Sequence, residues 1–358
     1  MKNLPKPIIS KKGKPAELTK KGYMQLYDLG VKVKKDYLNR MDVVSFRKAS
    51  IKTFASARTR CTDSASGFLE GLQSIGEPNE LTGDKQEADE GTDQVEGDEV
   101  DEGSVFINKH SIETQKRKTN YLFAASRACL GIYENSYKKG VNIPSKIWKS
   151  LDNFLSNLET KYGFYIEHYV KNPSRVNYLR LFTIEEYFHY IATENNIHFL
   201  SKQDLIWLEA LSSYIKIQWY SSGDPTFLRT INHELLSKIS FNLDSRNIWE
   251  ANYKQKSFDM VVYSGHDSSL LFLFMGLGLT SLKCLESLIL QAESEIAVSD
   301  AHLRSCLHFV DLADDFRIEL AERNGKAQVV LRKNNVYYKI GNPGGWTSPT
   351  VCGKKSAV

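Results

Sequence analysis

The segment VVYSGHDSSLL, from Val261 to Leu271, contains the residues best placed for chemistry. A β-branched apolar run ends in a Ser-Gly turn, the pair His266 and Asp267 follows, and a stretch typical of a helix comes next. In α/β proteins ligands bind where strands end, and the first amides of a helix attract anions. A histidine that stabilises negative charge beside a carboxyl group that releases a proton indicates phosphoryl transfer. By itself, such a pair is more often a buried histidine and a helix cap.

The charge of the chain is unevenly distributed. The formal net charge is +4, but residues 84–102 hold ten acidic residues and one lysine, a local charge of −9. The rest of the chain therefore carries +13, which attracts phosphates and other anions. Residues 76–104 have almost no apolar content and are predicted to form a disordered acidic loop, either a solvated insertion or a site for a protein partner. No basic patch with interleaved aromatic residues is present, so nucleic acid is not an expected partner.

The cysteines and the N-terminal residues indicate the cellular compartment of the protein. Five cysteines are widely spaced and form no CxxC or Cys/His cluster, so neither a metal site nor another cofactor is expected. The basic N-terminus lacks an apolar signal region, the longest apolar run is too short to span a membrane, and Pro173 blocks the nearest glycosylation match. These features predict a reduced, cytoplasmic setting if Met1 is the true start, and a lysosomal or secreted protein if upstream sequence is missing.

The N-terminal region is predicted to hold two helices around a strand. Apolar residues between Glu17 and Leu38 recur at three- and four-residue steps, with lysines on the opposite face and Thr19 as a cap. One or two short strands are expected within Met41 to Phe54. A second helix is predicted over Arg60 to Leu72, and it should bury four residues: Ala65, Phe68, Leu69 and Leu72.

The rest of the chain is predicted to be helical first and then mixed. From Ile112 to about Ser240 the pattern is mainly helical, with clear helical periodicity in residues 121–134, 146–163, 183–196 and 203–220. A strand over 258–264, a helix after His266, a hairpin over 316–331 with an Asn-Gly type I′ turn, and a third short strand follow. The predicted organisation is an N-terminal part of an α/β core (1–75), the acidic loop (76–104), a helical cap insertion (105–255), a C-terminal part of the core (256–340) and a tail (341–358).

Three motifs, in this order, resemble those of the histidine acid phosphatase family, branch 2 of the histidine phosphatase superfamily. ELTKKGYMQLYDLG (residues 17–30) resembles the family's LTxxGxxQxxxLG helix, and YSGHDSSLLFLFMGLGL (263–279) resembles its HD motif. RCTDSASGFLEGL (60–72) is similar to a helix of the phytases and of multiple inositol polyphosphate phosphatase. The resemblance implies a three-layer α/β fold with a mainly helical cap inserted into the core.

The resemblance also implies a chemistry. In this family a histidine of an N-terminal RHGxRxP motif attacks phosphorus, arginines clamp the phosphate oxygens, and no metal is needed. By carry-over, His266 is the expected phosphate ligand and Asp267 the general acid that protonates the leaving alcohol. The implied ligand is a phosphate ester or another anionic small molecule, with inositol phosphates favoured by the phytase-like second helix.

Two departures from the family pattern bear on activity. The sequence contains no RHGxRxP, and its first histidine is His110. Independently, aligning Arg60 with the family pattern places Phe54 where the phosphate-clamping arginine belongs. The cations that remain nearby as candidate phosphate ligands are Lys52, Arg58 and Arg60. Lys52 fits only if the register slips, and Arg60 corresponds to a peripheral arginine of the family.

Two hypotheses follow, and whether the chain is an enzyme is open between them. The first is a non-catalytic pseudophosphatase that binds an anion or a protein partner. The second is an active acid phosphatase or inositol-phosphate phosphatase whose RHGxRxP strand precedes the given sequence. Missing upstream sequence explains the absent nucleophile but not Phe54, and a phosphate held without its arginine clamp loses its strongest contacts. The first hypothesis is therefore preferred.

Two further patterns have simpler interpretations. Glu185, Glu186 and His189 give an EExxH spacing, but no second histidine completes a zinc site, so surface carboxylates and a half-buried histidine are expected. Cys61 is predicted to begin a helix, where a thiol can become reactive, but a small buried residue is the expected role.

Overall fold

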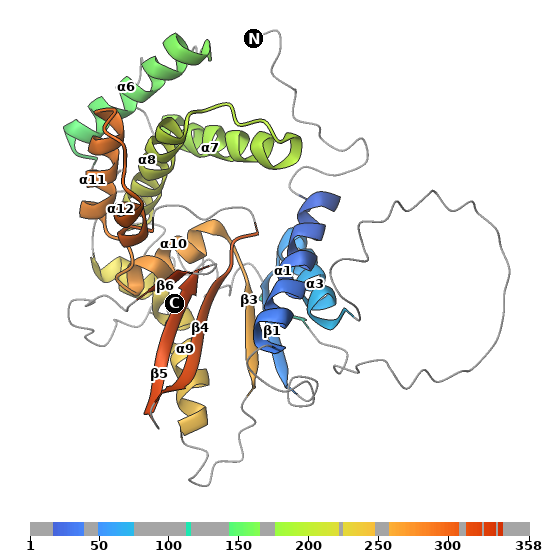
Figure 1. The fold of residues 1–358 in the computed structure, drawn as a ribbon. Coiled ribbons are helices and arrows are strands. Elements are labelled where there is room, and N and C mark those ends of the chain that lie inside the picture. The colour runs from blue at the N-terminus through green and yellow to red at the C-terminus, as the bar shows by residue number, and fades with distance from the viewer. Residues whose placement is uncertain are drawn as a thin grey trace, which may run out of the picture. The chain divides into compact units, whose positions relative to one another are not determined.

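The computed structural model describes residues 17–38, 49–74, 112–115, 143–164, 176–221, 225–247, 258–307, 313–323, 326–333 and 336–338. The acidic loop over 76–104, the helix over 121–134, the Asn-Gly turn of the hairpin and the tail over 341–358 lie outside these residues. The described elements form a mixed fold of helices and two sheets in which helix dominates (Figure 1).

The chain divides into two compact units, which are described separately. The sheet unit comprises α1 (Lys20–Leu38), β1 (Ile51–Ser56), α3 (Thr59–Gln73), β2 (Ile112–Gln115, apart from its last residue) and β3 (Met260–Ser264). The helical unit comprises α6 (Ser145–Tyr162), α7 (Val176–Asn195), α8 (Lys202–Ser221), α9 (Pro225–Asn247), α10 (Asp267–Gly276), α11 (Leu282–Glu293), α12 (Asp300–Ser305), β4 (Phe316–Arg323), β5 (Lys326–Lys333) and β6 (Val336–Tyr338). The chain passes from one unit to the other between Ser264 and Gly265.

The sheet of the sheet unit has the strand order β2-β1-β3. β1 and β3 are parallel although some 200 residues separate them, and Phe54 lies opposite Tyr263 in their register. Parallel neighbours need a crossover connection, which here includes most of the helical unit. The predicted strand over 258–264 is confirmed, whereas β2 is a strand at the start of a stretch predicted to be mainly helical.

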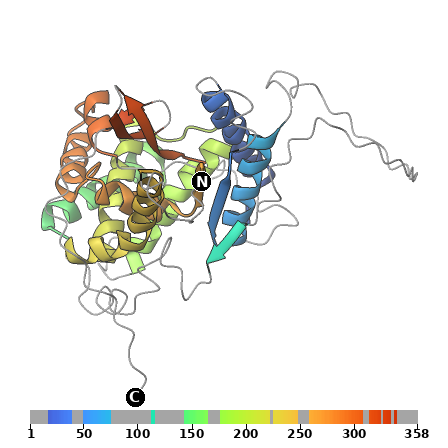
Figure 2. The ribbon, with the colours of Figure 1, turned by 90° about the horizontal axis from the view of Figure 1, so that it is seen from below.

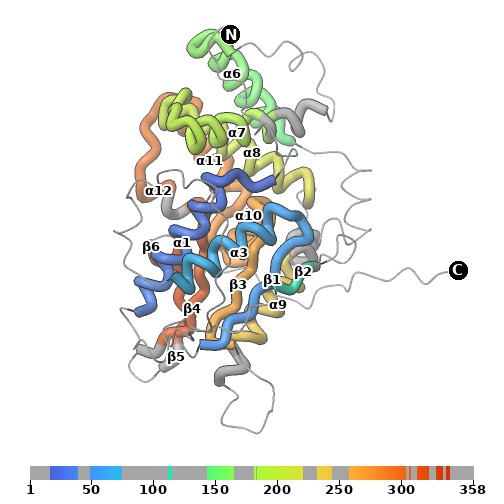
Figure 3. Tube along the Cα trace, turned by 90° about the vertical axis from the view of Figure 1, so that its right-hand side faces the viewer, coloured from blue at the N-terminus to red at the C-terminus, as the bar shows by residue number. Residues whose placement is uncertain are grey.

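The two predicted N-terminal helices are confirmed, and α3 packs on β1 and β3 while α1 packs on α3 (Figures 2 and 3). The Thr19 hydroxyl accepts a hydrogen bond from the Gly22 N–H at 3.0 Å, so Thr19 caps α1 as predicted. Glycines allow the two helices to approach closely, because a Cβ added at Gly30 would collide with the backbone of Phe68, and one at Gly71 with that of Tyr27. Gly30 and Gly71 of the family-like motifs are therefore packing residues here.

The core of the helical unit surrounds α8. This helix is buried along most of its length, and α6, α7, α9, α10 and α11 all contact it (Figure 1). The fully buried side chains Phe154, Leu158, Leu208, Leu211 and Ile215 belong to this core. The periodicity of residues 146–163, 183–196 and 203–220 predicted α6, α7 and α8 correctly, although α7 begins earlier, at Val176.

The second sheet is an antiparallel meander of β4, β5 and β6 in the helical unit. It confirms the predicted hairpin and the third short strand. The ring of Phe316 in β4 packs edge-on against Phe274 of α10, with centroids 5.1 Å apart. Asn232 of α9 donates a 2.7 Å hydrogen bond to the Phe272 carbonyl, so a second element also fixes α10.

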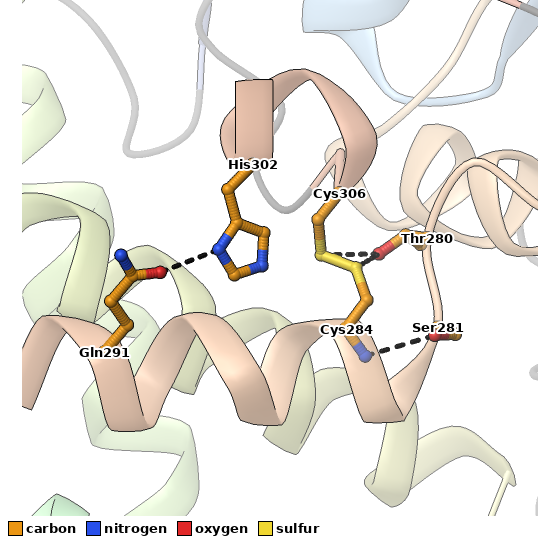
Figure 4. Close-up of a disulfide and its surroundings, with 6 residues drawn as sticks. All are labelled: Thr280, Ser281, Cys284, Gln291, His302 and Cys306. Carbon is orange, nitrogen blue, oxygen red and sulfur yellow. Dashed lines mark hydrogen bonds between the residues drawn. A yellow bond between two sulfur atoms is a disulfide. The ribbon is translucent and has the colours of Figure 1, made fainter. Parts of the chain in front are cut away.

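A disulfide joins Cys284 of α11 to Cys306, just after α12 (Figure 4). Thr280 Oγ1 lies 3.7 and 3.8 Å from the two sulfur atoms, and His302 Nδ1 lies 2.7 Å from Gln291 Oε1. The sequence did not predict this pairing. Disulfides form and persist mainly in oxidising compartments.

None of the helices in the described ranges is both long enough and apolar enough to cross a membrane.

Candidate functional site

The His-Asp pair begins α10, as the sequence predicted. His266 is the N-cap with an extended backbone, and its carbonyl accepts hydrogen bonds from the N–H groups of Ser269 and Leu270 at 3.0 and 3.2 Å. Its own N–H lies 3.4 Å from Ser269 Oγ. Asp267 occupies the first helical position, where the helix dipole stabilises a carboxylate. The four apolar residues Leu271 to Phe274 are buried and anchor this terminus.

Asp267 is bound by a lysine that the sequence prediction missed. Lys216 Nζ lies 2.8 Å from Asp267 Oδ2 and 3.0 Å from Glu185 Oε2. Ser212 Oγ donates a hydrogen bond to the same Glu185 oxygen. The Lys216 side chain is 11% exposed and that of Glu185 2%, whereas Asp267 is 46% exposed. Three helices, α7, α8 and α10, thus bring two carboxylates to one ammonium group.

These contacts set the protonation of the cluster. Partial desolvation by itself would raise the pKa of Asp267, but the charge and hydrogen bond of Lys216 outweigh it and hold the pKa below its ordinary value. Burial by itself would lower the pKa of Lys216, but Glu185 and Asp267 raise it above the ordinary value. Burial raises the pKa of Glu185 even though Lys216 and Ser212 oppose the shift. Asp267 is therefore the carboxyl group that stays ionised most readily.

Glu185 corrects an expectation about the EExxH pattern. It is buried and ion-paired, so the prediction of a surface carboxylate at this position is wrong. His189 is also more buried than expected, with Nε2 3.2 Å from Glu209 Oε1. Within the described ranges, no group of three or more His, Cys, Asp or Glu residues is arranged to hold a metal ion.

The ring of Phe54 contacts Tyr263 and Lys52. Phe54 stacks on Tyr263 across the β1–β3 pair, with centroids 5.4 Å apart and planes 13° from parallel. Lys52 Nζ lies 5.4 Å from the centre of the Phe54 ring and 2.8 Å from Glu113 Oε2. Lys52 and Phe54 thus share one side of β1, and Lys52 is already paired with a carboxylate.

Arg58 and Arg60 lie where β1 gives way to α3. Both are exposed, and the Arg58 carbonyl accepts the N–H groups of Cys61 and Thr62 as the N-cap of α3. Burial raises the pKa of the Cys61 thiol, although Arg60 and Arg58 oppose the shift, so Cys61 is a buried packing residue as expected. Ser264 Oγ donates a 2.7 Å hydrogen bond to the Cys61 carbonyl and fastens the end of β3 to α3.

The predicted site residues therefore fall into two groups. His266 and Asp267 belong to the helical unit, and Lys52, Arg58 and Arg60 belong to the sheet unit. Within its unit, Asp267 is paired with Lys216. The only indication of Lys216 in the sequence was its position as a single charged residue between Ile215 and Ile217. Glu185, 31 residues earlier, gave no local signal of its pairing with Lys216.

Comparison with known proteins decides the family. The family model of the histidine phosphatase superfamily, branch 2, matches residues 6–289. The chain belongs to this superfamily. It is therefore a relative of phosphomonoester hydrolases, as the three sequence motifs implied. No curated protein sequence matches it.

Solved structures of phytases resemble this branch 2 histidine phosphatase in fold. Hafnia alvei phytase in complex with myo-inositol hexakis sulphate aligns with a TM-score of 0.53 at 13% identity, covering 90% of this chain and 76% of the phytase. The same phytase in complex with tartrate aligns with a TM-score of 0.47 at 15% identity, covering 75% and 68% of the two chains. The first alignment confirms the predicted histidine-phosphatase-like fold.

Proposed function

We propose that this histidine phosphatase family member is a pseudophosphatase, which binds an anion but does not hydrolyse phosphate esters. The observation that carries the proposal is the Phe54–Tyr263 stack. The family resemblance assigns position 54 to an arginine that clamps phosphate oxygens. A phenyl ring has no hydrogen-bond donor, and bidentate guanidinium contacts are the strong ones in phosphate sites. Lys52 beside it is engaged by Glu113.

The state of Asp267 supports the same proposal. A general acid must carry a proton at the working pH, which requires a pKa near that pH. The ion pair with Lys216 lowers the pKa of Asp267 instead. At neutral pH this carboxyl group is an anion without a proton to give to a leaving alcohol.

The proposed ligand is a phosphate ester or a similar anionic small molecule. His266 stands at the N-terminus of the ten-residue helix α10, whose dipole attracts anions. The excess of positive charge outside residues 84–102 acts in the same direction. The Hafnia alvei phytase is seen with myo-inositol hexakis sulphate, so an inositol phosphate is the first candidate. Residues 105–255 are the proposed cap insertion, and residues 84–102 the proposed contact for a basic protein partner.

The alternative is an active acid phosphatase with its RHGxRxP strand upstream of the given sequence. The intact start of α10 favours it, since a strand, a short turn and the His-Asp pair follow one another as in the family motif. In that case His266 holds phosphate and Asp267 must gain a proton despite Lys216.

One experiment separates the two functions. Hydrolysis of a generic aryl phosphate is measured for the chain and for its His266→Ala and Asp267→Asn variants, and tungstate binding is measured by calorimetry on the same samples. We expect no turnover above buffer, together with tungstate binding that weakens about tenfold in the His266→Ala variant, the loss of one charge-assisted contact. Turnover that collapses in both variants would establish the active phosphatase. Folded protein without turnover or tungstate binding would contradict the proposed anion site and favour a protein-binding role.

A further inference from the structure

The buried ion cluster on α7, α8 and α10 has a role that the family chemistry does not assign. Ser212 and Lys216 are four residues apart on α8 and therefore share one face of that helix. Both contact Glu185 of α7, and Lys216 alone continues to Asp267 of α10. Lys216 is thus the bridge between a fully buried carboxylate and a half-exposed one.

The position of Lys216 is fixed by burial as well as by charge. Its ammonium group lies 5.3 Å from the centre of the Phe182 ring, on the same helix as Glu185. A lysine only 11% exposed cannot turn its head group into water, so it keeps its carboxylate partners. A charge buried without a partner is strongly unfavourable, and Glu185 prevents this whatever Asp267 does.

We infer that Lys216 is a positioning residue that fixes the Asp267 carboxylate as an anion at the start of α10. Protonating Asp267 would break its ion pair and leave the Lys216 charge to Glu185 alone. The inference rests on the proposed function only in treating Asp267 as the descendant of the family's proton donor. It gives that residue a new task, which is to tie the N-terminus of α10 to α8.

The charged groups around Asp267 support this assignment. Among the described residues, Lys216 from α8 and His266 from its own helix terminus lower the pKa of Asp267, and Glu185 from α7 lies beyond Lys216. Two carboxylates share one ammonium group, so any proton taken up by the cluster is divided between them. Burial raises the pKa of Glu185, whereas Lys216 lowers that of Asp267.

The test is a carbon NMR titration of the Asp267 side chain, with aspartate labelled at the carboxyl group and the signal assigned through Asp267→Asn. Wild-type Asp267 should titrate below its ordinary value of 3.8. The double variant Lys216→Met with Glu185→Leu removes the buried charges together, and its Asp267 should titrate at a higher pH than in the wild type. Lys216→Arg keeps the ion pair, so Asp267 in this variant should titrate as it does in the wild type.

A milder variant covers the case in which the double variant does not fold. Glu185→Gln preserves the shape and removes the competing carboxylate, so Asp267 should titrate at the wild-type value or lower. The inference is wrong if Asp267 titrates at the wild-type value in the folded double variant, or higher in Glu185→Gln. No ligand or substrate is present in these titrations. Aryl phosphate turnover by the chain would therefore overturn the proposed function without changing their result.

Discussion

The backbone of Gly71 in α3 lies against the Tyr27 carbonyl of α1, so closely that a Cβ at Gly71 would collide with that oxygen. Gly30 makes the reciprocal approach from α1 to Phe68 of α3. Two helices that meet through backbone contacts have no flexible side chain at the crossing that can move aside. The α1–α3 pair is therefore intolerant of added volume at these positions.

Gly71→Ala is accordingly expected to destabilise the protein. Overpacking costs about 1–3 kcal/mol, and the gain in helix propensity of about 1 kcal/mol offsets only part of it. Urea denaturation should show a lower midpoint for the variant. Gly22→Ala is the matched control, since its Cβ would meet mainly the flexible end of Leu18 at 3.0 Å. Equal urea midpoints for Gly71→Ala and Gly22→Ala would show that the α1–α3 contact accommodates the added methyl group.

Phe54→Arg tests the importance of the missing clamp. By the family resemblance, an arginine at this position should tighten tungstate binding about tenfold, the order of one charge-assisted contact. Phe54→Leu also removes the stack on Tyr263 but supplies no donor, so it should bind tungstate like the parent chain. Both variants should lose about 1 kcal/mol of stability with the ring pair. Unchanged binding by a folded Phe54→Arg variant would show that an arginine at position 54 does not contribute to anion binding.

The Cys284–Cys306 disulfide should be measurable in two ways. The sequence separation is 22 residues, for which loop-closure entropy gives about 3 kcal/mol of stabilisation that Cys284→Ser with Cys306→Ser should lose. Thermal unfolding of the double variant should occur at a lower temperature than that of the parent. Mass spectrometry after alkylation without reductant should find both cysteines unmodified. Alkylation of both in the untreated, folded protein would show that the bond is not formed.

Asp204 is expected to make the helical unit sensitive to acid. Burial by itself would raise its pKa, but hydrogen bonds from Lys161, Ser201 and Tyr162 lower it below the ordinary value of 3.8. The folded state therefore binds this proton less well than the unfolded state, and the stabilisation is full above the unfolded value and lost as pH falls through the folded one. The loss belongs to strongly acidic solutions, below about pH 4.

Asp204→Asn should remove this contribution. The variant should be less stable at pH 7 by about 1–3 kcal/mol, because Lys161, Ser201 and Tyr162 lose a charged hydrogen-bond acceptor. Its stability should then change less than that of the parent between pH 5 and pH 2, measured by chemical denaturation at each pH. Asp300→Asn is a suitable control, because Asp300 forms an exposed and loose ion pair. Its side chain is 72% exposed, and its Oδ1 lies 3.7 Å from Lys202 Nζ. Parallel pH curves for parent and Asp204→Asn would contradict the prediction.

Local sequence patterns predicted the elements but not the contacts made by residues distant in the chain. The apolar spacing identified α1, α3 and α8, and Thr19 was identified as a cap because capping depends on neighbours three residues apart. The strand status of residues 112–115 depends on pairing with β1 and is not encoded locally. The Lys216–Glu185 pair likewise requires two helices to meet, so neither residue could be assigned from its own segment.

The site was predicted to a similar degree. His266 and Asp267 were recognisable because strand, turn and helix cap are consecutive in sequence. The protonation of Asp267 was not, since it depends on an ammonium group 51 residues earlier. The disulfide was missed for the same reason, because nothing near Cys284 or Cys306 indicates that α12 folds back onto α11.

The disulfide also makes the chain tolerant of a cut. Residues 294–297, between α11 and α12, are exposed, and Glu295 there has a positive φ of 57°. A protease that cleaves this bend would cut the chain into two fragments. The disulfide would still hold the fragments together, because Cys284 and Cys306 lie on opposite sides of the cut. The fragment with the His-Asp helix would stay covalently attached to the β4–β6 sheet, whose Phe316 packs on that helix. Such a nicked protein would run as one band on a gel until a reductant is added.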